Sequence, residues 1–145
     1  MNDCVFCKIV RGELPCDAIY SDELVIAFLD IAPIAPGHTL IVPKEHHTSV
    51  TTLPDDLGAR MMKVAPRIGR AVMRVTEAGG FNLLLSNGAV AGQVVPHVHL
   101  HVIPRSADDG IILPTRTIPY ATDERKQDIV NRTKARLAVE SHGTC

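Results

Sequence analysis

The histidine-rich stretch near residue 100 organises the chain, and it reads Pro96-His97-Val98-His99-Leu100-His101-Val102-Ile103-Pro104. Three histidines alternate with apolar residues between two prolines, and strict alternation over this length predicts a half-buried β-strand. Because side chains two residues apart share one face of a strand, the apolar residues are expected to pack into a core. The histidines then lie in a row on the opposite face, about 6.6 Å apart. A row of groups that titrate near neutrality on one rigid face indicates a catalytic role rather than a solvent-facing surface.

Length, composition and charge narrow the class of protein. The chain has 145 residues, of which 46% are hydrophobic and 21% are charged, and its net charge is −1. These values predict a single domain over residues 1–145 that buries its own core. Because the net charge is near zero and the chain has no basic block or aromatic platform, we expect no nucleic-acid partner.

The sequence also carries an expectation about the cell compartment. No apolar run approaches the roughly 20 residues that span a bilayer, and the start, Met1-Asn2-Asp3-Cys4, does not resemble a signal peptide. We therefore expect a cytoplasmic protein with no membrane partner. In that compartment the four cysteines are expected to be reduced. They are Cys4, Cys7, Cys16 and Cys145.

Four further segments have the composition of strands. The segment at 24–30 is almost continuously apolar, so it is expected to lie centrally in the sheet. Residues 31–37 carry two prolines and a glycine and predict a loop. The four predicted strands are at 18–20, 24–30, 38–42 and 81–85.

A long helix is expected to begin near Pro54. Thr52 is its expected N-cap, and two aspartates favour the positive end of the helix dipole. Apolar residues recur at helical spacing as far as Val75, while Pro66 should kink or split the helix. Gly79-Gly80 should end it.

Shorter helical segments are expected near both ends of the chain. Residues 8–11 predict a short helical turn. After a loop at 106–120, residues 122–138 predict an amphipathic helix that Thr122 caps. The tail from there to Cys145 is expected to be frayed.

The motif Cys4-Val5-Phe6-Cys7 has three interpretations from sequence alone. It can be half of a zinc site or a redox pair, or it can be two buried thiols, since free cysteine is commonly a core residue. The chain also offers His46 or His47, together with one histidine of the row. Two thiolates and two imidazoles form a common tetrahedral ligand set for structural zinc, which here would attach the N-terminus to the sheet.

A second group of residues fits chemistry at phosphorus. Neutral imidazole is a nucleophile toward phosphorus when its other nitrogen is held as a donor. Amide donors, a second imidazole and a glycine-rich loop stabilise charge on phosphate oxygens. No nucleophilic Ser or Cys motif and no paired acidic cluster for Mg²⁺ is present, so we predict metal-independent chemistry with histidine as the covalent carrier. The group consists of His99, His101, His38, Asn87, Gln93 and the loop at 88–92.

These features together resemble the histidine triad (HIT) superfamily. The segment 97–103 fits the family pattern His-x-His-x-His-x-x, in which each x is apolar. The resemblance covers about residues 4–105, leaves 106–145 unmatched, and is closest to small nucleotide-binding HIT hydrolases of the zinc-bearing bacterial type. It implies an α+β fold with a five-stranded antiparallel meander sheet, a long helix and a C-terminal helix, and it implies a homodimer. The other matching segments are 4–9, 27–31, 37–44, Asn87 and Gly92-Gln93.

The resemblance implies a role for each residue of the chemical group. His99 would attack the α-phosphorus of a nucleotide and form a nucleotidyl-histidine intermediate, which water then hydrolyses. His101 and Asn87 would hold phosphate oxygens, with help from Gln93 and nearby backbone. His38 would support the row by hydrogen bonding.

The resemblance also implies how a purine nucleotide similar to AMP or GMP is held. Asp30 would take the ribose hydroxyls, and Gly92 and Val94 would lie beside the nucleotide. The residues implied as walls of the base pocket are Val5, Phe6, Ile9, Phe28 and Ile31. The residues implied as ligands of a structural zinc, which the chemical step does not require, are Cys4, Cys7, His46 and His97.

One position departs from the family pattern. After Gly-Gln, phosphoramidate-cleaving relatives often have Ser or Thr, whose hydroxyl helps to protonate an amine leaving group. Here that position is Val94, which has no proton to give, so the task would fall to Gln93 or to water.

Four functional hypotheses follow. We favour a hydrolase that cleaves nucleoside phosphoramidates, aminoacyl adenylates or related nucleotides. The second is a dinucleoside polyphosphate hydrolase with the same chemistry, and the third is a nucleotide-binding regulator or scaffold without a catalytic role. The fourth is a catalytic zinc site in which all three histidines of the row bind one metal.

Overall fold

The structure is a computed structural model that describes residues 4–113 and 117–140. The chain divides into two compact units, Met1–Ile111 and Ile112–Cys145, which are considered separately below. The prediction of one domain over the whole chain therefore stays a prediction. The expected tail up to Cys145, and part of the expected loop at 106–120, lie outside the described residues.

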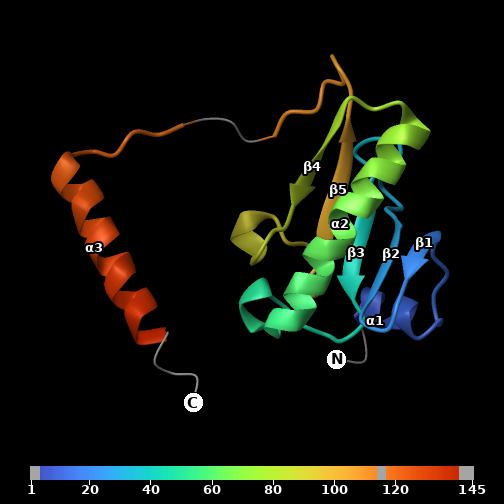
Figure 1. Ribbon diagram of the computed structural model, residues 1–145, viewed down its shortest axis with the longest axis horizontal. Helices are drawn as coiled ribbons and strands as arrows, with labels where there is room; N and C mark the ends of the chain where they lie inside the picture. Colours follow the sequence, from blue (N-terminus) through green and yellow to red (C-terminus); the bar gives the residue numbers. More distant parts are fainter. Residues whose placement is uncertain (1–3, 114–116, 141–145) are drawn as a thin grey trace. The chain divides into compact units, whose positions relative to one another are not determined.

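The first unit contains a five-stranded antiparallel sheet (Figure 1). The strand order is β1-β2-β3-β5-β4, so the first three strands form a meander and the last strand lies between β3 and β4. This confirms the predicted α+β class with five antiparallel strands. The strands are β1 at Ala18–Ser21, β2 at Val25–Leu29, β3 at Thr39–Pro43, β4 at Gly80–Leu84 and β5 at Leu100–Arg105.

The long helix α2, Asp55–Thr76, lies across one face of the sheet (Figure 1). The prediction that Thr52 caps it is wrong: Thr52 belongs to the 3₁₀ turn η1, Val50–Thr52, and its hydroxyl donates to the Ser49 carbonyl at 2.8 Å. Pro66 lies inside α2 without splitting it. Proline removes one helical hydrogen bond, and the apolar residues that α2 buries against the sheet keep the helix continuous. They are Leu57, Met61, Val64, Ala65, Ile68, Gly69 and Val72.

The sheet is covered on both faces. Under α2, one cluster joins Val25, Ile41 and the helix residues. On the opposite face, Phe6 of the short helix α1, Val5–Val10, packs with Phe28 and Val42. Helix α1 therefore covers the part of the second face where the histidine row begins.

The histidine row alternates as predicted, but the formal strand is shorter than expected. Val98, Leu100 and Val102 all lie in the cluster under α2, which confirms that the apolar residues point to the core. The ladder of β5 begins only at Leu100. Before it, the backbone groups have other partners, since the Val98 N–H donates to the His47 carbonyl at 2.7 Å. Two histidines of the row are themselves buried, with His97 at 0% and His99 at 7% exposure, and His101 is partly buried.

The second unit contains the helix α3, Asp123–Glu140. The Thr122 hydroxyl accepts a hydrogen bond from the Arg125 N–H at 3.1 Å, so the predicted cap is confirmed.

No helix in the described residues is long and apolar enough to cross a membrane. The remaining short helix, η2 at Ala89–Ala91, lies in the first unit, in the loop between β4 and β5.

Candidate functional site

Four potential metal ligands converge where α1 meets the sheet. They come from distant parts of the chain: Cys4 and Cys7 from the N-terminus, His46 from the segment after β3, and His97 from the start of the row. Cys4 Sγ lies 3.4 Å from His97 Nδ1, and Cys7 Sγ lies 3.2 Å from His46 Nδ1. The two imidazole Nδ1 atoms are 3.2 Å apart. All four ligand atoms lie within 4.8 Å of one another.

This geometry fits the donor set of tetrahedral zinc. Zinc binds nitrogen at about 2.0–2.1 Å and sulfur at about 2.3 Å, which gives tetrahedron edges of roughly 3.3–3.8 Å. His97 also satisfies the usual requirement that a ligand imidazole donates through its other nitrogen. Its Nε2 lies 2.9 Å from the Pro43 carbonyl oxygen, so Nε2 carries the hydrogen and Nδ1 is left as a bare donor atom for a metal.

The structure separates His46 from its neighbour His47, which spacing alone had left as alternatives. His46 belongs to the four-residue cluster, whereas the ring of His47 lies with its Nε2 3.5 Å from the Glu45 carboxylate. Cys4, Cys7 and Cys16 are free thiols.

The hydrogen bonds of His99 leave its Nε2 without a hydrogen. His99 Nδ1 lies 2.7 Å from the backbone carbonyl oxygen of His97. A carbonyl only accepts hydrogen bonds, so Nδ1 carries the hydrogen and the lone pair of the neutral ring is on Nε2. The ring packs edge-on against Phe6, with 5.2 Å between ring centroids.

A relay of two hydrogen bonds, from the Ile34 N–H through His38, fixes the opposite tautomer in His101. The Ile34 backbone N–H donates to His38 Nδ1 at 3.1 Å, so the hydrogen of neutral His38 is on Nε2. That Nε2 lies 2.8 Å from His101 Nδ1 and donates to it. His101 therefore carries its own hydrogen on Nε2, the nitrogen that does not face His38. The ring of His101 lies beside that of His99, with 4.9 Å between centroids.

Burial keeps the rings of His101 and His38 neutral. Burial, reinforced by the nearby His99 and His38 rings, lowers the pKa of His101 to about 4. Burial also lowers the pKa of His38, against an opposing effect of the Asp30 carboxylate, whose Oδ2 lies 3.7 Å from His38 Nε2. Near pH 7 the pair consists of two neutral imidazoles in defined tautomers.

The hypothesis that all three row histidines bind one metal is wrong for this geometry. Among the described residues, the potential metal-binding groups place His97 with the cysteines and do not include His99. A further group joins Asp30, His38 and His101. In that group His38 Nε2 carries a hydrogen, which excludes it as a ligand in the tautomer that the Ile34 N–H selects.

The residues named for the base pocket divide into a buried and an exposed set. Phe6 packs on Phe28 with 5.8 Å between centroids, and both are buried, while Phe6 also contacts the ring of His99. Ile9 packs against the same cluster. Val5 is partly exposed at the surface of α1, and Ile31 is 101% exposed, so its side chain is entirely in solvent.

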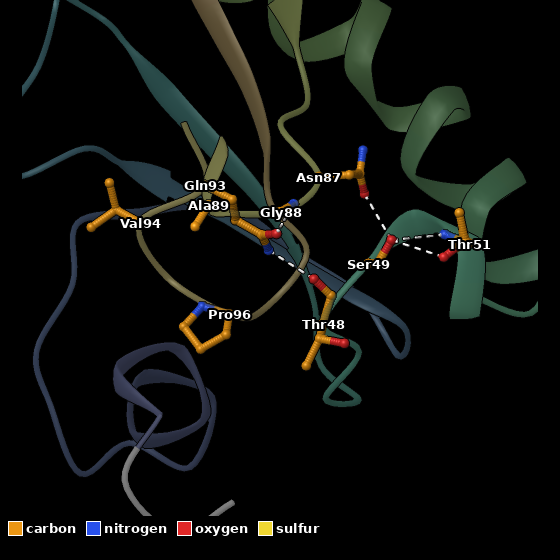
Figure 2. Close-up of a pocket in the computed structure, with 9 residues that line it drawn as sticks. All are labelled: Thr48, Ser49, Thr51, Asn87, Gly88, Ala89, Gln93, Val94 and Pro96. Carbon is orange, nitrogen blue, oxygen red and sulfur yellow. Dashed lines mark hydrogen bonds between the residues drawn. The ribbon is translucent and has the colours of Figure 1, made fainter. Parts of the chain in front are cut away.

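The loop after β4 holds two carboxamides and borders a cavity of about 710 Å³ (Figure 2). Asn87 Oδ1 accepts from the Val50 N–H at 2.8 Å and from Ser49 Oγ at 3.2 Å. Gln93 Oε1 accepts from the Gly88 N–H, and Gln93 Nε2 donates to the Thr48 carbonyl, both at 2.7 Å. The cavity is lined by Thr48, Ser49, Thr51, Asn87, Gly88, Ala89, Gln93, Val94 and Pro96.

Sequence reasoning missed the contribution of the segment at 48–51. Thr48 and Ser49 each contact a predicted site residue that lies about 40 residues away in the chain. The signal that was available is a Ser/Thr-rich run directly after His46-His47. The glycines in the loop have a turning role, since Gly88 and Gly92 both have φ of 87°, a conformation that favours glycine.

The fold and the site define a small α+β protein with a Cys₂His₂ cluster next to a buried histidine row. The HIT domain family matches residues 11–108. The chain belongs to the HIT domain family.

Two curated relatives show the range of names in the family. "Adenylylsulfatase HINT3" of Arabidopsis thaliana is 46% identical over 108 residues, which cover 74% of this chain and 55% of that protein. The chain thus spans about half the length of this relative. "Adenosine 5'-monophosphoramidase hnt1" of Schizosaccharomyces pombe is 36% identical over 124 residues, which cover 85% of this chain and 90% of that protein.

Two solved structures are similar over most of the chain. A protein from Streptococcus mutans UA159 has a TM-score of 0.87 at 38% identity, covering 94% of this chain and 87% of its own. A zinc-bound histidine triad family protein from Mycobacterium smegmatis has a TM-score of 0.73 at 37% identity, covering 92% of this chain and 98% of its own.

Proposed function

We propose that this protein is a hydrolase that cleaves nucleotides at the α-phosphorus, with nucleoside phosphoramidates as its substrate class. The observation that carries the proposal is the pair of opposite tautomers at His99 and His101. One ring presents a bare Nε2 as nucleophile, and its neighbour presents an Nε2–H that can donate to a phosphate oxygen. The names of the two curated relatives, an adenylylsulfatase and a monophosphoramidase, support a nucleotide substrate.

The first step forms a bond between His99 Nε2 and the α-phosphorus. The P–N bond to the leaving group breaks, and its electron pair leaves with the amine, which takes a proton from water. The substituted ring of His99 keeps its Nδ1–H on the His97 carbonyl, and that hydrogen bond stabilises the positive charge of the intermediate. Water then attacks phosphorus, and the bond to His99 Nε2 breaks with its electron pair returning to the neutral ring. The proton of the attacking water neutralises the hydroxide left by the first step, and the nucleoside monophosphate is released.

The amides and His101 serve the phosphate during both steps. Asn87 Oδ1 is already held by Ser49 and Val50, which leaves the Nδ2 end for a non-bridging oxygen. Gln93 is held at both ends of its amide, by Gly88 and Thr48, so its role is to shape the loop. This is why we assign the proton for the amine to water rather than to Gln93.

The rest of the assignment concerns the nucleoside. We assign Asp30 to the ribose hydroxyls and the Phe6–Phe28 pair to the buried wall of a purine pocket, completed by the more exposed residues at its mouth. Those residues are Val5, Ile9 and Ile31, while Gly92 and Val94 lie on the phosphate side. A homodimer in the cytoplasm completes the proposal, and light scattering of the purified chain tests the dimer.

We assign a structural zinc ion to Cys4, Cys7, His46 and His97. When bound, zinc supplies a tetrahedral crosslink between the N-terminus and the sheet, and the chemical step uses no metal. The ligand distances and the His97–Pro43 hydrogen bond support this assignment, as does the zinc in the Mycobacterium smegmatis relative.

The surroundings of Asn87 and Gln93 are our reason for proposing phosphoramidates rather than dinucleoside polyphosphates. The residues that line the cavity beside these two amides carry hydroxyl, amide and apolar groups and no charged side chain. A polyphosphate leaving group brings several negative charges, which are usually bound by Arg, Lys or a cation. We therefore expect a higher kcat/KM for an adenosine phosphoramidate than for a dinucleoside polyphosphate.

The deciding experiment is the intact mass of the protein after rapid mixing with adenosine phosphoramidate and a quench without acid. Wild type is expected to gain the mass of one adenylyl group, and His99→Ala is expected to gain none. Absence of the adduct and of turnover in wild type, together with tight binding of AMP, would support the regulator or scaffold hypothesis instead.

A further inference from the structure

Asn87 is held at only one end of its carboxamide. The Val50 N–H and the Ser49 hydroxyl both donate to Oδ1, at 2.8 and 3.2 Å. Two converging donors identify this atom as the oxygen, because an amide NH₂ accepts no hydrogen bonds. In Figure 2 the Nδ2 end points away from Ser49, and the hydrogen bonds of the described residues include no partner for it.

The Ser49 hydroxyl is itself oriented by its own turn. Its Oγ accepts from the Thr51 N–H at 3.3 Å and lies 2.9 Å from Thr51 Oγ1. With the Thr51 hydroxyl donating to it, the single hydrogen of Ser49 is directed to Asn87. The 3₁₀ turn η1 therefore presents two donors, one from the backbone and one from a side chain, to one amide oxygen.

We propose that Ser49 is a positioning residue that keeps the two Nδ2 hydrogens of Asn87 directed at the substrate phosphate. The proposal rests on the proposed function, in which Asn87 binds a non-bridging oxygen. Without Ser49, only the Val50 N–H would oppose rotation of the amide by half a turn, which would place Oδ1 against that oxygen, where two acceptors repel each other. This role adds to the proposed site a residue that lies beside the turn η1, before α2.

The test compares three variants in steady-state hydrolysis of adenosine phosphoramidate. Ser49→Ala removes the donor to Asn87, and Ser49→Thr retains a hydroxyl. Thr52→Ala is the matched control, since its hydroxyl bonds the same turn through the Ser49 carbonyl and does not contact Asn87. We expect Ser49→Ala to lower kcat about fivefold with little change in KM, the loss expected for one ordinary hydrogen bond. Ser49→Thr should recover most of that loss, and Thr52→Ala should stay near wild type.

A double-mutant cycle separates positioning from a general effect on the turn. In an Asn87→Ala background, Ser49→Ala should cause no further loss of kcat, because the amide that it orients is gone. An equal loss in the Thr52→Ala variant, or an undiminished effect of Ser49→Ala in that background, would overturn the proposal.

Binding of AMP keeps the two proposals distinguishable. If wild type binds AMP without turning over the phosphoramidate, the hydrolase proposal fails, and the positioning role is then measured by titration calorimetry. Ser49→Ala should weaken AMP binding about fivefold, and Thr52→Ala should leave it unchanged. Equal affinities of wild type and Ser49→Ala would overturn the positioning role in that case too.

Discussion

The neutral state of His101 predicts a specific loss of stability in acid. Its pKa is about 4 in the folded protein, mainly because the ring is buried, whereas an unfolded histidine titrates near pH 6.5. Between these values the unfolded chain binds a proton that the folded chain does not, so the free energy of unfolding falls as the pH falls. The contribution is fully present above about pH 6.5 and lost by about pH 4. A span of about 2.5 pH units corresponds to about 3 kcal/mol.

Urea unfolding of wild type and His101→Asn between pH 7.5 and 4 measures this effect. Asparagine offers an oxygen near the position of Nδ1, which can still accept from His38, and it does not titrate. The free energy of unfolding of wild type should fall by about 3 kcal/mol more than that of the variant over this range. Release of the proposed zinc in acid would affect both proteins and cancel in the difference. Parallel curves for the two proteins would refute the buried neutral state of His101.

Two further predictions concern the relay and the metal cluster. His38→Leu removes the donor to His101 and should lower kcat by about 10- to 100-fold, whereas His38→Gln, which places an amide N–H near the same point, should recover much of it in steady-state kinetics. Similar losses in both variants would contradict the relay. In urea titrations, the protein treated with a chelator should have a free energy of unfolding about 3 kcal/mol lower than the zinc-saturated protein. Its activity should decline together with the circular dichroism signal. Immediate loss of activity with an intact signal would contradict a structural role.

Local patterns predicted the elements that bury one regular face. The alternation at 96–104 placed Val98, Leu100 and Val102 in the core, where they lie. The sequence pattern identified α2 and its start near Pro54. It did not identify the cap, because the turn η1 uses Thr52 for its own hydrogen bonds. Pro66 was expected to interrupt the helix, and tertiary packing outweighs the single hydrogen bond that proline removes.

The site was only partly predictable, because its contacts join distant segments. Residue type suggested which side chains belong together, yet spacing alone could not choose between His46 and His47, and the turn after Pro43 makes that choice. The role of Ser49 depends on a hydrogen bond to a residue 38 positions away, which leaves no local pattern in the sequence. The tautomers of His99 and His101 likewise depend on backbone groups, the His97 carbonyl and the Ile34 N–H.

His97 connects the Cys₂His₂ cluster to the proposed chemistry through two different parts of one residue. Its ring lies among the cysteines and donates through Nε2 to the Pro43 carbonyl, while its own carbonyl accepts the Nδ1–H of His99. A metal at Nδ1 would hold the ring at both nitrogens, so the ring could not turn without breaking one of these contacts. The carbonyl of His97 selects the tautomer of His99 and leaves Nε2 bare. We therefore expect a metal at Nδ1 of His97 to act on His99, the proposed nucleophile, by restricting the residue whose carbonyl is its hydrogen-bond acceptor, without contacting the substrate.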